Sequence, residues 1–173
     1  LYEAYAGLNG GAFPESGLIK ATLLNTANDY GNTGPDFSFG WGMVNGLRAA
    51  MLIEEGRYLD ATIAQGANNN HSITVPANTR EVRFMVYWTD AAAAPGASPA
   101  LVNDLDLVVT DPGSTTYQPW VLDTTPSAAF LNSPATTGAD HLNNMEQVAI
   151  TNPTAGTYNI NVAGFNVPMG PQK

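Results

Sequence analysis

The chain has no cysteine and few charged residues, and among the charged residues the basic ones are scarcest. Six Lys and Arg stand against fifteen Asp and Glu in 173 residues, a formal net charge of −9. The absence of cysteine rules out disulfides but leaves the cellular compartment open. An acidic surface lacks the phosphate attraction on which nucleic-acid affinity depends. We therefore expect no nucleic-acid partner. No run of 18 apolar residues is present, so we expect no membrane partner either.

Turn-forming and apolar residues are abundant. Hydrophobic residues make up 44% of the chain, with 17 Gly and 12 Pro, and such a composition is typical of strands joined by many turns. The chain starts with Leu1 rather than Met and shows no signal peptide. We therefore expect an excised fragment of a longer protein.

Residues 1–56 have a helical pattern. Ile19, Leu23 and Ala27 recur four positions apart, which places them on one apolar helix face. Asn45 is a favourable N-cap for a later helix. The expected helices are residues 1–6, a segment from Ser16 to a stop at Gly31, and residues 45–56. Three short helices have too few partners to form an independent domain, so we expect this part to be incomplete.

From residue 57 onward the apolar period changes to two, which is the period of strands. The expected strands are residues 59–64, 71–75, 81–89, 104–110, 146–151 and 157–163. No helix is expected between them, and this favours an antiparallel β-sandwich, most simply a jelly roll. Residues 91–100 and 124–139 are expected to be long surface loops. The predicted fold class is thus mainly β, with a short all-helical segment (1–56) preceding a sandwich domain (57–173).

The residues for triad hydrolysis are missing. The chain has two histidines, His71 and His141, and no Gly-x-Ser-x-Gly turn that would present a nucleophilic serine. Both histidines are interpreted as surface residues. Paired carboxylates for glycoside hydrolysis are a weaker alternative, because acidic loops on sandwiches are more often solvated or metal-bound. We expect no catalytic residue and no organic cofactor in this chain.

Two segments of the helical part resemble subtilisin-like serine proteases (subtilases). Residues 18–27 are similar to a late helix of the subtilase catalytic domain. Residues 39–50 contain Gly40-Trp41-Gly42-Met43-Val44-Asn45-Gly46, similar to the Gly-x-Gly-x-Val-Asn-Ala pattern that closes that domain. In the second half, residues 101–110, 143–148, 156–158 and 166–172 resemble the C-terminal sandwich of some alkaline subtilases. The resemblance spans essentially the whole chain.

The resemblance implies that this chain is the C-terminal part of a secreted serine endopeptidase. The helices would complete the α/β catalytic domain, and the sandwich would stabilise it. The catalytic residues of that family would lie upstream of Leu1, so the chain alone would be inactive and its partner would be the N-terminal catalytic portion. In such proteases a further apolar strand usually follows Gly-Pro-Gln, and Lys173 ends the chain before it.

The resemblance also implies bound Ca²⁺, and the sequence offers suitable oxygen donors. In a strand, Asp104 and Asp106 share one face while Leu105 and Leu107 face the core. Two neighbouring carboxylates on one face repel each other, which favours a cation between them. The expected ligands are Asn103, Asp104, Asp106, Asp123, Asp140 and Asn144, with Asn143 in the same polar cluster as the last two.

The alternative is a free-standing jelly-roll module that binds carbohydrate or protein. Trp88 and Trp120 would then provide the sugar platform, although core packing is the simpler interpretation of both. This alternative leaves the helical part unexplained.

Overall fold

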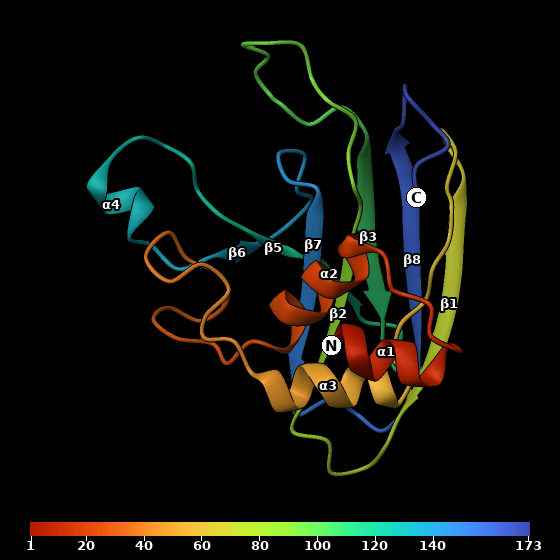
Figure 1. Ribbon diagram of the computed structural model, residues 1–173. Coiled ribbons are helices and arrows are strands. Elements are labelled where there is room, and N and C mark those ends of the chain that lie inside the picture. Colours follow the sequence, from red (N-terminus) through yellow and green to blue (C-terminus); the bar gives the residue numbers. More distant parts are fainter. The chain divides into compact units, whose positions relative to one another are not determined.

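The structure, a computed structural model, describes residues 1–173 and separates them into two compact units. The helical unit contains residues 1–60 and 122–135, and the sandwich unit contains residues 61–121 and 136–173 (Figure 1). The helical unit thus extends beyond the predicted residue 56 and includes a later segment. Its incompleteness stays a prediction.

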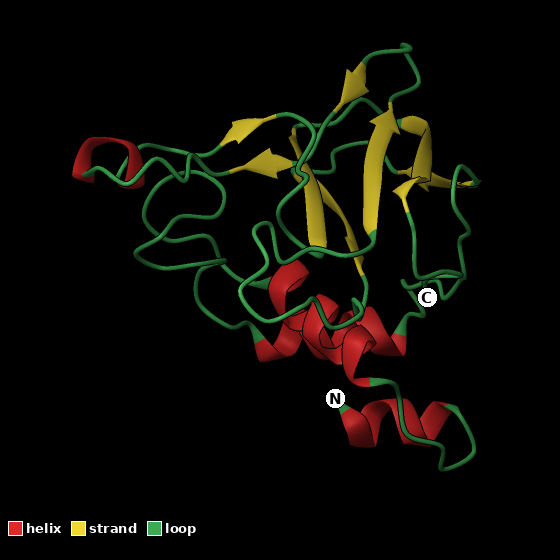
Figure 2. Cartoon of the chain, turned by 90° about the horizontal axis from the view of Figure 1, so that it is seen from above, coloured by secondary structure: helices red, strands yellow, loops and turns green.

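The helical unit contains four helices, and the three predicted ones are present, although the second ends at Thr26 and not at the predicted stop Gly31. The fourth, at residues 128–131, was not expected, because residues 124–139 were predicted to be a loop and no helix was predicted between the strands. Asn45 is the N-cap of the third, and its side-chain oxygen accepts a hydrogen bond from the Arg48 N–H at 3.0 Å. Figure 2 shows the helices in red, joined by long loops. No helix is both long and apolar enough to cross a membrane. The bounds are α1 Tyr2–Leu8, α2 Ser16–Thr26, α3 Gly46–Glu54 and α4 Ala128–Leu131.

The helical unit buries little apolar surface. Its buried hydrophobic residues are Ala27, Ala49 and Ile53. Of the sixteen large hydrophobic side chains exposed in the whole structure, eleven lie between Tyr2 and Leu59. A unit with this balance has a very small core for its number of exposed apolar groups.

The sandwich unit is built from antiparallel strands. β1, β8, β3 and β4 form one sheet in that order, while β2 pairs with β7 and β5 pairs with β6. The bounds are β1 Asn68–Val75, β2 Glu81–Tyr87, β3 Asp104–Thr110, β4 Thr116–Tyr117, β5 Trp120–Val121, β6 Thr136–Thr137, β7 Met145–Thr151 and β8 Gly156–Asn166.

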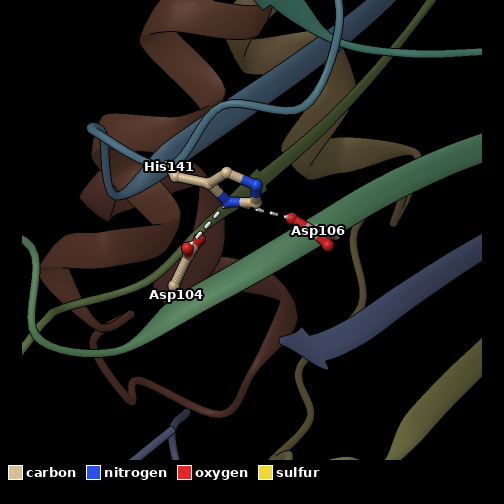
Figure 3. A group of neighbouring side chains, drawn as sticks. All are labelled: Asp104, Asp106 and His141. Carbon is tan, nitrogen blue, oxygen red and sulfur yellow. Dashed lines mark hydrogen bonds and ion pairs between the residues drawn. The ribbon is translucent and has the colours of Figure 1, made fainter. Parts of the chain in front are cut away.

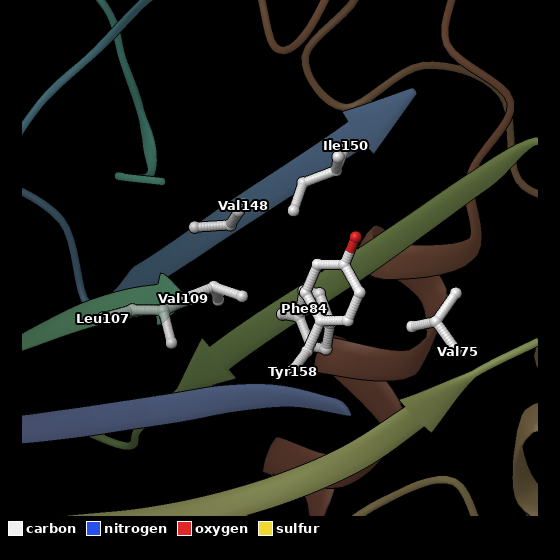
Figure 4. Close-up of a cluster of buried hydrophobic side chains, with 7 residues drawn as sticks. All are labelled: Val75, Phe84, Leu107, Val109, Val148, Ile150 and Tyr158. Atoms are coloured by element: carbon white, nitrogen blue, oxygen red, sulfur yellow. The ribbon is translucent and has the colours of Figure 1, made fainter. Parts of the chain in front are cut away.

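A hydrophobic core joins the four-stranded sheet to the β2–β7 pair. Leu107 and Val109 of β3 meet Phe84 of β2 and Val148 of β7, and Tyr158 of β8 packs at 6.1 Å from the Phe84 ring (Figure 4). The structure is therefore mainly β with antiparallel sheets, consistent with a β-sandwich. The finer jelly-roll topology stays a prediction.

The expected strand at 59–64 is wrong. Only Ile63 of this segment pairs, through two backbone hydrogen bonds with Gln172 at 2.7 and 2.8 Å. Ile63 is also its one buried residue, whereas Leu59 is exposed. The segment therefore has no continuous apolar face to cover a sheet. The short strands β4, β5 and β6 were not expected.

The core predicts that two isoleucine-to-alanine substitutions lower the free energy of unfolding by different amounts. Ile150→Ala removes a buried side chain from the core and should lower the free energy of unfolding by about 2–5 kcal/mol. Ile73 of β1 is 38% exposed, so Ile73→Ala should cost clearly less than Ile150→Ala. Urea unfolding of both variants measures this, and equal losses would contradict the core described here.

Candidate metal centre

Strand β3 divides apolar from acidic side chains. Leu105 and Leu107 are buried in the core, as predicted, and Asp104 and Asp106 lie on the opposite face. Asp104 is only 6% exposed and Asp106 is half-buried. Two carboxylates thus lie close together in a partly water-excluded environment.

His141 joins these carboxylates from the loop before β7. Its Nδ1 lies 2.8 Å from Asp104 Oδ2 and 3.7 Å from Asp106 Oδ1 (Figure 3). The imidazole stacks on Phe165 of β8, with 4.4 Å between ring centroids and 18° between planes. One donor atom from each of Asp104, Asp106 and His141 lies within 4.8 Å of the others. This constellation is the candidate metal centre.

A third carboxylate, Glu146 of β7, reaches the edge of β3. Its Oε2 accepts a hydrogen bond of 2.6 Å from the Leu107 N–H. Because β4 pairs only with Val109 and Thr110, this earlier part of the β3 edge is open to a side chain. Glu146 is 1% exposed, so it is a buried link between the two sheets of the sandwich.

Three buried carboxylate oxygens in this region have no hydrogen-bond partner. They are Asp104 Oδ1, Asp106 Oδ1 and Glu146 Oε1. A buried, unpaired charge is costly, and such groups usually bind a metal, pair with a cation or take up a proton. The region therefore favours positive charge.

The electrostatics agree with that preference. Burial raises the pKa of Glu146 to about 9, and the charges of Asp106, Asp140 and Asp104 add to the increase. Burial also raises the pKa values of Asp104 and Asp106, although the nearby His141 opposes the change in both. Four acidic groups thus share one neighbourhood with a single imidazole.

Asn103 was expected to be a ligand, but its side chain holds the C-terminal segment. Its Nδ2 donates to Gln172 Oε1 at 2.8 Å and to the Met169 carbonyl at 3.1 Å, and its Oδ1 accepts from the Met169 N–H at 3.0 Å. The Asn103 carbonyl accepts from the buried Trp88 indole at 2.8 Å. Asn103 thus binds Trp88 through its backbone carbonyl and the end of the chain through its side-chain amide, which is fully hydrogen-bonded.

The other expected ligands also have local partners. Asp140 accepts hydrogen bonds from the Leu142 N–H and the Asn143 side chain, at 2.9 and 2.7 Å. Asn144 Nδ2 donates to the Trp88 carbonyl at 2.7 Å. Asp123 belongs to the helical unit, where it accepts from the Thr125 N–H at 2.8 Å. Of the six predicted ligands, Asp104 and Asp106 are the pair that converge on the candidate metal centre.

These residues fit Ca²⁺ only in part. Ca²⁺ takes six to eight oxygen ligands. Asp104 and Asp106 provide carboxylate oxygens, but the third donor that converges with them is the imidazole nitrogen of His141. Calcium at this place stays a prediction.

The sequence reasoning missed His141 and Glu146 as members of the site. His141 was interpreted as an ordinary surface histidine, although it directly follows the candidate ligand Asp140. Glu146 lies at a buried position of β7. An acidic residue on the core-facing side of this expected strand would have been the signal that it belongs to the site. Both depend on which loop and strand pack beside β3, and spacing along the chain does not give that.

Comparison with known proteins relates the chain to proteins named as serine proteases. It is 25% identical over 167 residues to a Dictyostelium discoideum protein named serine protease/ABC transporter B family protein tagA, covering 89% of this chain and 9% of that protein. It is 36% identical over 97 residues to the tagB protein of the same name and organism, covering 55% and 5%. No family model matches. The chain thus spans less than a tenth of either relative, and the similarity gives weak support for a protease-related protein.

The raised pKa of Glu146 predicts a pH-dependent stability in the presence of a chelator. The unfolded chain loses this proton near pH 4.5, whereas the folded chain keeps it to about pH 9. The contribution of Glu146 to the free energy of unfolding should be fully present below pH 4.5. It should decline as the pH rises towards 9, by at most about 1.4 kcal/mol per pH unit.

Glu146→Gln is the matched variant for this prediction. Glutamine keeps an acceptor for the Leu107 N–H but does not ionise, so the decline between pH 4.5 and 9 should become shallower. Asp104, Asp106, Asp140 and His141 are retained in both proteins, so the difference between the two slopes reports Glu146 together with its coupling to these groups. Urea unfolding across this pH range gives the two slopes, and parallel slopes would show that Glu146 does not titrate as described.

Proposed function

We propose that this chain is the C-terminal part of a secreted subtilisin-like serine endopeptidase, in which it completes and stabilises the catalytic domain. The observation that carries the proposal is the apolar surface of the helical unit. The serine-protease names of the relatives and the subtilase-like motifs at residues 18–27 and 39–50 support the same assignment. The catalytic residues belong to the upstream portion of that enzyme.

Helix α3 shows the unmatched apolar surface best. Ala49 and Ile53, one turn apart, are fully buried, while Leu47 and Met51, also one turn apart, are exposed. A helix that is apolar on both sides is typical of an element enclosed in a larger core. Leu47 is 72% exposed, and full burial of a leucine side chain is worth about 1.5–3 kcal/mol. Covering α3 would therefore be strongly favourable.

The occupant that we propose for this surface is the upstream part of the same protease. The segments around α3 add further exposed apolar groups, including Phe13, which is 76% exposed. A tethered partner that binds only the folded state acts at high effective concentration and stabilises it by mass action. The sandwich, proposed as a jelly roll, would add stability through a bound divalent cation, which the resemblance predicts to be Ca²⁺.

The carbohydrate-binding alternative has less support in the described residues. The Trp88 ring is buried and its indole N–H donates to the Asn103 carbonyl at 2.8 Å, so this ring is not presented to a ligand. Trp120 is half-buried. A sugar platform needs exposed aromatic faces. The alternative also leaves the exposed face of α3 without a role.

A fluorophosphonate probe tests the protease assignment directly. The probe reacts with activated serine nucleophiles, and it should label the longer natural product that contains this chain while leaving the 173-residue chain unlabelled. Peptide mapping should place the label upstream of Leu1. A longer product that takes no label, or labelling of this chain alone, would contradict the proposal.

Leu47→Ser tests the role of the exposed helix face. In the isolated chain the side chain is exposed, so its loss should change the free energy of unfolding by no more than about 0.5 kcal/mol. In the longer protease the same change should cost about 2 kcal/mol or more, because the leucine is then buried. Ile73→Ser on β1 is the control, and its effect should be the same in both proteins. Equal effects of Leu47→Ser in both proteins would remove the argument from α3.

A further inference from the structure

We propose that Asp104, Asp106 and His141 bind a transition-metal ion of the Zn²⁺ class in preference to Ca²⁺. The proposal concerns the sandwich unit alone and does not depend on the protease assignment. The metal would connect the loop before β7 to strand β3.

The donor atoms decide the class of metal. Ca²⁺ and Mg²⁺ are hard ions that take oxygen ligands, whereas imidazole nitrogen suits Zn²⁺, Cu²⁺, Ni²⁺ and Fe²⁺. Here one imidazole nitrogen converges with two carboxylates. Zn²⁺ accepts both donor types and commonly uses three protein ligands with an open fourth position.

The spacing of the donors suits a small ion. His141 Nδ1 lies 2.8 Å from Asp104 Oδ2 and 3.7 Å from Asp106 Oδ1. Ligands about 2.0–2.1 Å from a tetrahedral ion are separated by about 3.3 Å. These two separations lie on either side of that value, and all three donor atoms lie within 4.8 Å of one another.

The Asp104 carboxylate, which is more than nine-tenths buried, points independently to a cation, and the buried Glu146 lies next to it. Asp104 is 6% exposed and Glu146 is 1% exposed, and each has one buried oxygen with no hydrogen-bond partner. Glu146 lies beside the site through its bond to the N–H of Leu107, the residue that follows Asp106. His141 Nδ1 faces one oxygen of each aspartate, at 2.8 Å from Asp104 Oδ2 and 3.7 Å from Asp106 Oδ1, while Asp104 Oδ1 has no hydrogen-bond partner. A divalent ion would balance the negative charges of Asp104 and Asp106.

Phe165 holds the imidazole in the required orientation. The stacked rings direct Nδ1 of His141 towards β3, and His141 is 44% exposed, so an ion can reach the site from solvent. The chain contains no cysteine and one other histidine, His71 on β1. His71 therefore provides a matched control for a nitrogen ligand elsewhere in the sandwich.

Metal titrations of the chelator-treated 173-residue protein test the proposal. We expect Zn²⁺ to bind with one-to-one stoichiometry and to raise Tm, and Co²⁺ to give visible absorption bands characteristic of nitrogen ligation. His141→Ala should weaken Zn²⁺ binding by about tenfold or more and change the Co²⁺ bands, while His71→Ala should leave both unchanged. Asp106→Asn, at the more exposed carboxylate, should also weaken Zn²⁺ binding without loss of fold.

The competing result is equally clear. Binding of Ca²⁺ that is unaffected by His141→Ala, together with no specific Zn²⁺ or Co²⁺ binding, would overturn the proposal and assign the acidic residues to calcium. Equal loss of Zn²⁺ binding in His71→Ala and His141→Ala would also overturn it, because the ion would then bind non-specifically to histidine.

Discussion

The alternation of side chains along β3 is the constraint on which the sandwich unit depends. One face of the strand supplies Leu105, Leu107 and Val109 to the core, and the same period-two geometry places Asp104 and Asp106 on the other face. A slip of one residue would exchange these faces and bury both carboxylates in the apolar core. Core packing therefore fixes the position of the acidic pair, and the acidic pair in turn creates the demand for positive charge.

The helical unit depends on a different balance. Its buried core is limited to Ala27, Ala49 and Ile53, while large apolar side chains remain exposed on and around α3. Helices of this size gain most of their stability from packing an apolar face rather than from intrinsic propensity. This balance supports the proposal that the unit belongs to a larger core, and the motifs at residues 18–27 and 39–50 and the protease-related names of the relatives agree with that proposal.

Much of the fold followed from local patterns in the sequence. The period of 3.6 located α2, the cap at Asn45 located α3, and period two located β3 and most other long strands. The prediction of a strand at 59–64 failed because this segment has no continuous apolar face, with Ile63 buried but Leu59 exposed. The site was predicted less completely, since Asp104 and Asp106 are neighbours in sequence but His141 reaches them across 35 residues or more. Its position depends on how a loop and β8 pack beside β3, which the pattern of one segment does not contain.

Hydrogen–deuterium exchange of α3 tests the central claim most directly. The account predicts that backbone amides from Gly46 to Glu54 exchange rapidly in the isolated chain and become strongly protected in the longer protein that contains it. Protection should increase little for β7, whose core residues are already buried by the sandwich itself. Equal protection of α3 in the two proteins would contradict the view that these helices were shaped to pack against another part of a protease.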